Sequence, residues 1–209
     1  MHRTLFTAPL INSVLRRASV AFLKWRGWQL DGELPDDHIK CVLIAAPHTS
    51  NWDLPYTLMV AFALHLNIYW MGKASIFNWP FGGLMRWLGG LPVQRQQSGN
   101  LVAASAAALR AADGPVQLIV APEGTRAKTR HWKTGFYWIA REAKVPIVMA
   151  YLDYPRKLGG LGPVFTPTDD VEADMAAIKT GKATAPIGKP RVASEVAWPA
   201  PVATPATAP

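Results

Sequence analysis

Three short, almost purely apolar runs recur along the chain, and they restrict its possible folds more than any other feature. They are KCVLIAA at 40–46, VQLIVA at 116–121 and PIVMAY at 146–151. Apolar runs of this length, without polar alternation, are typical of strands buried on both faces of a parallel sheet. Segments long enough for helices lie between them. The pattern therefore predicts an α/β fold, a single domain with a largely parallel central sheet flanked by helices.

The segments between the runs have the composition of helices and shorter strands. Helices are expected over 52–66, 101–112 and 135–143, a strand over 67–71, and a short edge strand over 92–95. Residues 72–92, which follow the strand over 67–71, are rich in Gly, Pro and Trp, and no helix or strand is expected there before the edge strand.

The N-terminal segment 10–28 has the spacing of an amphipathic helix. Its apolar residues fall on one stripe: Leu10, Ile11, Val14, Leu15, Ala18, Ala21, Phe22 and Trp25. Four cations flank the stripe: Arg16, Arg17, Lys24 and Arg26. A basic helix with such a face suits a membrane interface, because the apolar side chains enter the acyl boundary while the cations meet phosphate headgroups. An ordinary helix packed on the core remains the alternative.

The domain organisation follows from length and local composition. A chain of 209 residues fits one domain. Residues 1–30 are expected to form the N-terminal amphipathic helix and residues 31–182 the main domain. Residues 183–209 are dominated by Ala, Pro and Thr, so they are expected to form a disordered tail.

Charge and composition indicate the partners. Lys and Arg number 22 against 14 acidic residues, a net charge of +8, so an anionic partner is expected. Nine Trp residues and a hydrophobic content of 50% favour an anionic membrane surface over nucleic acid. The best apolar segment, 56–70, contains His65 and Asn67 and is too short to span a bilayer. The single cysteine, Cys41, lies in an apolar run and is expected to be an inert strand residue.

The sequence PHTSNWD at 47–53 follows the first apolar run, where open α/β sheets place their ligands. His48 and Asp53 lie at the junction between this loop and a helix, so the carboxylate can reach back to the imidazole. A carboxylate that accepts from one ring nitrogen makes the other nitrogen a better general base. A structural histidine at a helix start is the alternative. Ser50 lies in no nucleophile elbow, and His48 has no partners at zinc spacing.

A second polar cluster, PEGTR at 122–126, follows another apolar run. Gly124 allows a ligand to approach the backbone, Thr125 offers a hydroxyl, and the Arg126 guanidinium matches a phosphate. Arg95 and Lys73 are further cations that could converge on the same oxyanions. An internal ion pair between Glu123 and Arg126 is the alternative.

Four blocks of this sequence together resemble the glycerolipid acyltransferases typified by 1-acylglycerol-3-phosphate acyltransferase, the family with the HxxxxD motif. They occur in the family's order: HTSNWD at 48–53, GGLPVQR at 89–95, PEGTR at 122–126 and VPIV at 145–148. The sequence differs from the commonest pattern at Pro47, where many members have Asn, and at Ala121, where an aromatic residue is common. These differences bear on the acceptor more than on the chemistry.

The resemblance implies a role for each matching residue. His48 is expected to be the catalytic base and Asp53 its charge partner. Glu123, Gly124, Thr125 and Arg126 are similar to the acceptor-binding block, to which Arg95 adds a phosphate-binding residue. The block that contains Val145 and Ile147 is expected to line or support the site, or to be a core strand.

The function implied is transfer of a fatty acyl group from acyl-CoA or acyl-carrier protein to the free hydroxyl of a lysophospholipid, in phospholipid biosynthesis. No cofactor and no metal are expected, since the acyl thioester is a co-substrate. The expected location is peripheral, on the cytoplasmic face of the inner membrane. A non-catalytic lipid-binding protein of the membrane surface is the alternative, and no nucleic-acid partner is expected.

Overall fold

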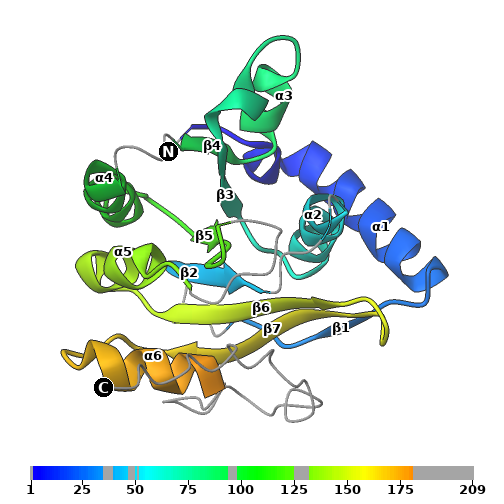
Figure 1. Ribbon diagram of the computed structural model, residues 1–209. Coiled ribbons are helices and arrows are strands. Elements are labelled where there is room, and N and C mark those ends of the chain that lie inside the picture. The colour runs from blue at the N-terminus through cyan, green and yellow to red at the C-terminus, as the bar shows by residue number, and fades with distance from the viewer. Residues whose placement is uncertain are drawn as a thin grey trace.

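The computed structural model describes residues 2–34, 40–46, 50, 52–93, 98–124 and 132–180, with residues 98 and 99 described by their backbone alone. One seven-stranded sheet runs through the molecule in the order β1-β7-β6-β2-β5-β3-β4 (Figure 1). Its strands are β1 (Gln29–Asp31), β2 (Lys40–Ala45), β3 (Ile68–Lys73), β4 (Gly90–Val93), β5 (Val116–Val120), β6 (Ile147–Asp153) and β7 (Leu158–Phe165). Every neighbouring pair is parallel except β6 with β7. The predicted α/β class with a largely parallel sheet is confirmed.

Helices cover both faces of the sheet. They are α1 (Pro9–Trp25), α2 (Asp53–Ala63), α3 (Gly82–Trp87), α4 (Ser98–Arg110), α5 (Gly135–Ala143) and α6 (Val171–Thr180), with short 3-10 turns at Leu5–Thr7 and Ala74–Phe77. Helices α4, α5 and α6 lie on one side of the sheet, and α1 and α2 on the other (Figure 1). The predicted helices near 10–28, 52–66, 101–112 and 135–143 correspond to α1, α2, α4 and α5.

Strand β2 shows how the sequence produces the two layers. Successive side chains of a strand point to opposite faces. Val42 and Ile44 accordingly pack into the core beneath α4, α5 and α6, whereas Cys41 and Leu43 pack into the core beneath α2 and the N-terminal turn. All four are at most 1% exposed, which is why this run has no polar alternation. The expectation that Cys41 is a buried strand residue is confirmed.

The sequence pattern missed four elements, β1, α3, β7 and α6. Strand β7 reads LGGLGPVF, and its three glycines and one proline hid a strand that is buried along most of its length. Pro163 is tolerated because the pairing of β6 with β7 shifts register between Val148 and Ala150. Strand β1 has only three residues and α3 only six, too few to produce a periodic pattern.

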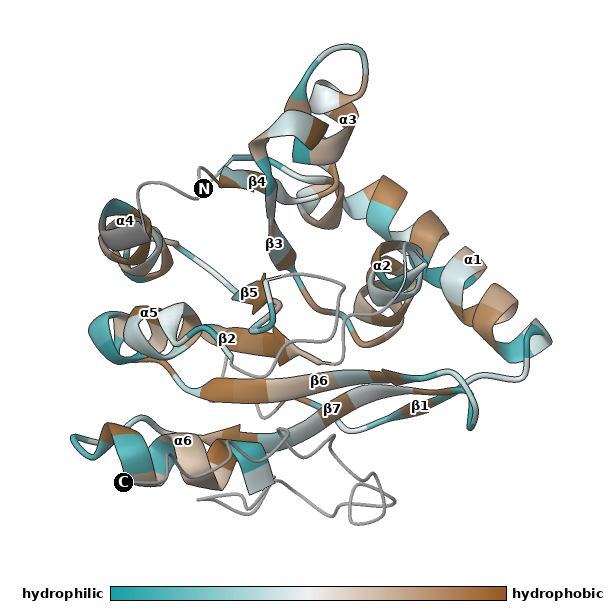
Figure 2. Ribbon diagram, in the orientation of Figure 1, coloured by the Kyte–Doolittle hydropathy of each residue, from teal (hydrophilic) through white to brown (hydrophobic). Residues whose placement is uncertain are grey.

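Most of the apolar stripe of α1 faces solvent, although Leu15 is partly buried against the core. Leu10 is 84%, Val14 66% and Trp25 77% exposed, whereas Ser19 and Leu23 on the opposite side of the helix are buried. Figure 2 shows brown, hydrophobic segments along α1 at the outside of the molecule. A helix that packs its apolar face on a core would show the reverse. The alternative of an ordinary core-packed amphipathic helix therefore does not account for α1.

The stretch 76–87 carries further exposed apolar residues. They are Ile76, Trp79, Phe81, Leu84 and Trp87, of which Trp79 is 93% exposed. Phe77 differs, since it is 4% exposed and packs with Trp70 in the core. Among the residues that the structure describes, no helix has both the length and the apolar character to cross a bilayer.

Candidate active site

A large pocket opens where the parallel strands end. Its volume is about 1340 Å³. The carboxyl ends of β2, β5, β3 and β6 all contribute to its wall through Ala45, Val120, Lys73 and Leu152. Ligands bind at this edge in open α/β sheets because the loops that follow the strands converge there. The predicted position of the site, after the apolar runs, agrees with this arrangement.

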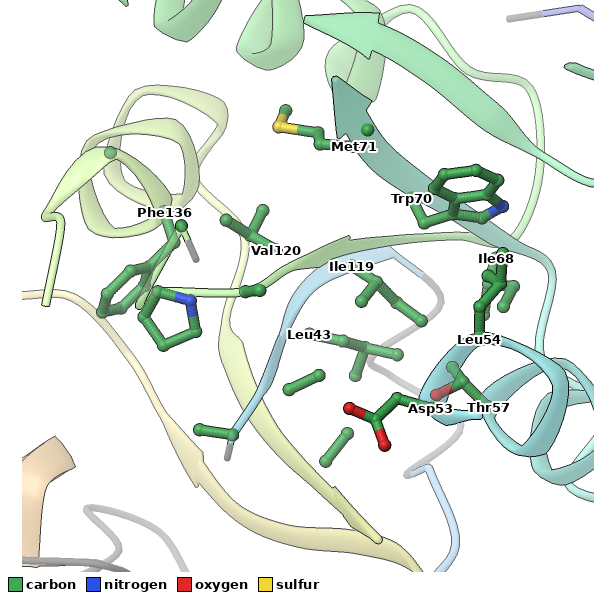
Figure 3. A pocket seen from close by; sticks show the side chains of 18 of the residues that line it. Leu43, Asp53, Leu54, Thr57, Ile68, Trp70, Met71, Ile119, Val120 and Phe136 are labelled. Carbon is green, nitrogen blue, oxygen red and sulfur yellow. The ribbon is translucent and has the colours of Figure 1, made fainter. Parts of the chain in front are cut away.

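Asp53 lies in the wall of the pocket at the first position of α2. Its carboxylate is nearly buried, with 6% of the residue exposed. The backbone N–H of Ser50 donates to Oδ2 at 2.9 Å, and the hydroxyl of Tyr154 donates to Oδ1 at 2.8 Å. Figure 3 shows the carboxylate beside Leu43 and Thr57. The start of a helix favours a negative charge at this position.

The pocket also brings together Lys73 and Gly124, two further predicted site residues from separate segments. Gly124 has φ +62, in the left-handed region that favours glycine. A Cβ at Gly124 would lie 3.1 Å from Nζ of Lys133, so a lysine ammonium lies directly over this backbone. Lys133 is held there by its own N–H, which donates to the Pro122 carbonyl at 2.8 Å.

Several predicted site residues lie outside the described residues. They are His48, Arg95, Thr125 and Arg126. Glu123 is half-buried, next to Gly124. Since Arg126 is outside the described part of the chain, the ion pair between Glu123 and Arg126 stays an open alternative.

A family model described as Acyltransferase matches residues 33–152. That segment spans more than half of the chain, and all four motif blocks lie within it. The chain belongs to the acyltransferase family. A comparison with curated proteins gives no match.

Among solved structures, this acyltransferase is similar to the crystal structure of the 1-acyl-sn-glycerophosphate (LPA) acyltransferase PlsC from Thermotoga maritima. The two share 14% sequence identity, and the match covers 80% of this chain and 75% of that chain with a TM-score of 0.52. At this identity the likeness supports the shared fold.

The fourth motif block, residues 145–148, leads into the buried start of β6. Val145 is 9%, Ile147 0% and Val148 1% exposed, and they pack into the cores on the two faces of the sheet. None of these three is among the described residues that line the pocket. In this acyltransferase the block is a core strand.

Sequence reasoning missed two residues of the site: Lys133, which lines the pocket, and Tyr154, which donates to Asp53 from outside the pocket lining. Tyr154 approaches Asp53 from a turn 101 residues further along the chain, and no spacing rule joins the two. Lys133 lies seven residues beyond the last residue of PEGTR. Its proximity in sequence to PEGTR, the motif expected to bind phosphate, was the only signal that could have identified it.

Proposed function

We propose that this protein transfers a fatty acyl group from an acyl thioester, acyl-CoA or acyl-carrier protein, to the free hydroxyl of a lysophospholipid such as 1-acylglycerol 3-phosphate. The reaction would serve phospholipid biosynthesis. The observation that carries the proposal is the position of Asp53, whose buried carboxylate is held by two donors in the wall of a large pocket at the carboxyl edge of the sheet. The family membership and the HTSNWD block support the same chemistry.

In the proposed mechanism, His48 accepts the proton of the acceptor hydroxyl as its oxygen attacks the thioester carbonyl. The carbonyl carbon becomes tetrahedral and its oxygen negative. When the C–S bond breaks, the carbonyl re-forms and the thiolate takes the proton from the imidazolium. Asp53 stabilises that imidazolium and fixes its orientation. Because the acyl group passes directly from sulfur to oxygen, no covalent acyl-enzyme is needed.

A fatty acyl chain needs an apolar cavity, and the pocket has one. Its lining includes Leu54, Trp70 and Ile119, none of which carries a charge (Figure 3). The volume of about 1340 Å³ exceeds that of most small-molecule pockets. This supports a long-chain substrate.

An anionic acceptor needs cations near its phosphate. Lys73 and Lys133 line the pocket, and the Lys133 side chain lies over the Gly124 backbone, where a Cβ would otherwise stand. The predicted phosphate-binding residues Arg95 and Arg126 would add two guanidinium groups. This set supports a phosphate-bearing lysophospholipid over a neutral alcohol.

We also propose that the protein docks peripherally on the anionic cytoplasmic face of the inner membrane. The exposed stripe of α1, with Leu10, Val14 and Trp25, would enter the interface. Arg17 and Lys24 are exposed on the same helix, where they can meet anionic headgroups. Trp79 and Phe81 would form a second apolar contact.

The test is thiol release from a long-chain acyl-CoA by the purified full-length protein, with and without lysophosphatidic acid. Wild type and His48→Ala are compared side by side, with acyl-carrier-protein donors and other lysophospholipids as further arms. A thiol reagent can monitor the reaction because Cys41, the one cysteine, is buried. We expect acceptor-dependent release that His48→Ala abolishes while the fold, measured by circular dichroism, is kept.

Activity of His48→Ala near the wild-type level would contradict the proposed mechanism. If wild type uses no donor or acceptor but still binds anionic vesicles, the alternative of a non-catalytic lipid-binding protein replaces the proposed function.

A further inference from the structure

Tyr154 touches the carboxylate of Asp53, yet it belongs to none of the four motif blocks and lies just beyond residue 152, where the family match ends. It stands in the turn that follows β6. Its hydroxyl donates to Asp53 Oδ1 at 2.8 Å, while the Ser50 N–H donates to Oδ2 at 2.9 Å. Each oxygen of the carboxylate therefore has its own donor, and rotation of the carboxylate about the Cβ–Cγ bond would break both hydrogen bonds.

The ring of Tyr154 is held by contacts with two other aromatic rings, those of Trp28 and Tyr56. It forms T-shaped pairs with Trp28, at a centroid distance of 5.4 Å, and with Tyr56, at 5.6 Å, with interplanar angles of 88° and 78°. Trp28 and Tyr56 pack on each other at 4.6 Å. The three rings come from the loop after α1, from α2 and from the turn after β6. Edge-to-face contacts of this kind fix a ring and so aim its hydroxyl.

The hydroxyl stays protonated in this setting. Burial, and next the hydrogen bond to Asp53, raise the pKa of Tyr154 above its ordinary value. Tyr154 is thus a permanent donor at neutral pH. A hydrogen bond to an ionised carboxylate is stronger than one between neutral groups.

We propose that Tyr154 is a positioning residue that holds the Asp53 carboxylate in the orientation needed to act on the base. This inference rests on the proposed function, in which Asp53 orients His48. Tyr154 is not among the described residues that line the pocket, so it acts through Asp53 and not on substrate. Its loss should slow the chemical step and leave substrate binding unchanged.

Tyr154→Phe is the informative variant, because it keeps the ring contacts with Trp28 and Tyr56 and removes only the donor. We expect kcat to fall on the order of tenfold, while KM for the thioester and for the acceptor stays within about twofold. Steady-state kinetics with both substrates varied measures the two effects separately.

Tyr137→Phe is the matched control. Tyr137 also donates from a buried ring to a buried aspartate, Asp174, at 2.8 Å, but it does so between α5 and α6. It should keep the wild-type kcat even if both variants lower the melting temperature. In an Asp53→Asn background, Tyr154→Phe should cause no further loss, since a residue that acts through Asp53 has nothing left to orient.

A Tyr154→Phe variant with wild-type kcat would overturn the inference, as would equal losses of kcat in Tyr154→Phe and Tyr137→Phe. A rise in KM at unchanged kcat would overturn it too, because it would indicate a contact with substrate. Inactivity of the wild type with every donor and acceptor would overturn the proposed function instead, so the two failures are distinguishable.

Discussion

The backbone N–H of Ser50 donates a 2.9 Å hydrogen bond to Oδ2 of Asp53, so the carboxylate points back along the chain toward the segment that precedes α2. This is the orientation that the HTSNWD block requires of a charge partner for His48. Asp53→Asn should therefore lower kcat by about 10² to 10⁴-fold, because an amide cannot stabilise an imidazolium. Acceptor-dependent thiol release measures the loss.

Asp174→Asn is the control for this variant. Asp174 is also a buried aspartate and accepts from Tyr137 and from the Thr168 N–H, on the face of the sheet covered by α5 and α6. It should lose stability while keeping activity. Comparable losses of kcat in both variants would show that Asp53 serves the fold and not the reaction.

The fold was largely predictable where burial shapes the sequence. The runs that contain β2, β5 and β6 are apolar because both of their faces are covered, and this pattern gave the α/β class. Strand β7 was not predicted, because close packing requires glycine at Gly159 and Gly160. A Cβ at Gly160 would lie 1.9 Å from the Asp31 carbonyl oxygen. The packing that requires glycine there also removes the β-branched residues by which a strand is recognised.

The candidate site was predictable only where its residues are close in sequence. His48 and Asp53 form one block, and Gly124 lies in another. The hydrogen bond from Tyr154 joins the turn after β6 to the start of α2, so it arises from the parallel arrangement of β2 and β6 and not from any local pattern. The contact between Tyr154 and Asp53 exists only in the folded chain.

Membrane binding can be tested on α1 without disturbing the core. The double variant Val14→Asp with Trp25→Ser should weaken binding to anionic vesicles by on the order of tenfold or more, because both side chains would leave the interface. Their exposure of 66% and 77% predicts little change in melting temperature. Co-sedimentation with vesicles of phosphatidylglycerol and phosphatidylcholine measures the binding.

Leu30→Ser provides the comparison for the α1 variant, since Leu30 is an exposed apolar residue of β1 and not of the helix. It should bind vesicles like the wild type. Unchanged vesicle binding by the α1 double variant would rule out the stripe as the docking surface.

The ammonium of Lys133 should contribute to binding of the acceptor phosphate. Lys133→Gln is expected to raise KM for lysophosphatidic acid about fivefold to tenfold, the loss of one charge-assisted contact, and to change KM for the thioester less. Lys179→Gln, in the last turn of α6, removes one positive charge outside the pocket lining and should leave both values unchanged. If Lys179→Gln has the same effect, net charge and not Lys133 determines acceptor affinity.

The stability of the protein should fall in alkali partly because of Cys41. Burial raises the pKa of this thiol from its ordinary value of 9.0 to about 12. Between these values the unfolded chain ionises Cys41 while the folded chain keeps the proton, so the free energy of unfolding falls as pH rises, by up to about 1.4 kcal/mol per pH unit. Below pH 9 the thiol is protonated in both the folded and the unfolded chain, so Cys41 causes no loss of stability there.

Cys41→Ala should lower the free energy of unfolding at neutral pH, because packing is lost. Between pH 9 and 12, however, the free energy of unfolding of the variant should fall less steeply than that of the wild type. Tyr137, whose pKa burial raises to about 12, contributes to the decline in both proteins. Chemical denaturation at a series of pH values measures the difference, and parallel curves would contradict the assignment.

Both ends of α1 are fastened to the body of the protein. Before the helix, Leu5 and Phe6 are buried and the Tyr69 hydroxyl donates to the His2 carbonyl; after it, Trp28 is buried and β1 pairs with β7. The helix therefore cannot roll about its own axis. Removal of one residue from its middle would turn the two halves of the stripe about 100° out of line, and any lipid surface that the helix meets lies at a fixed height and tilt relative to Asp53.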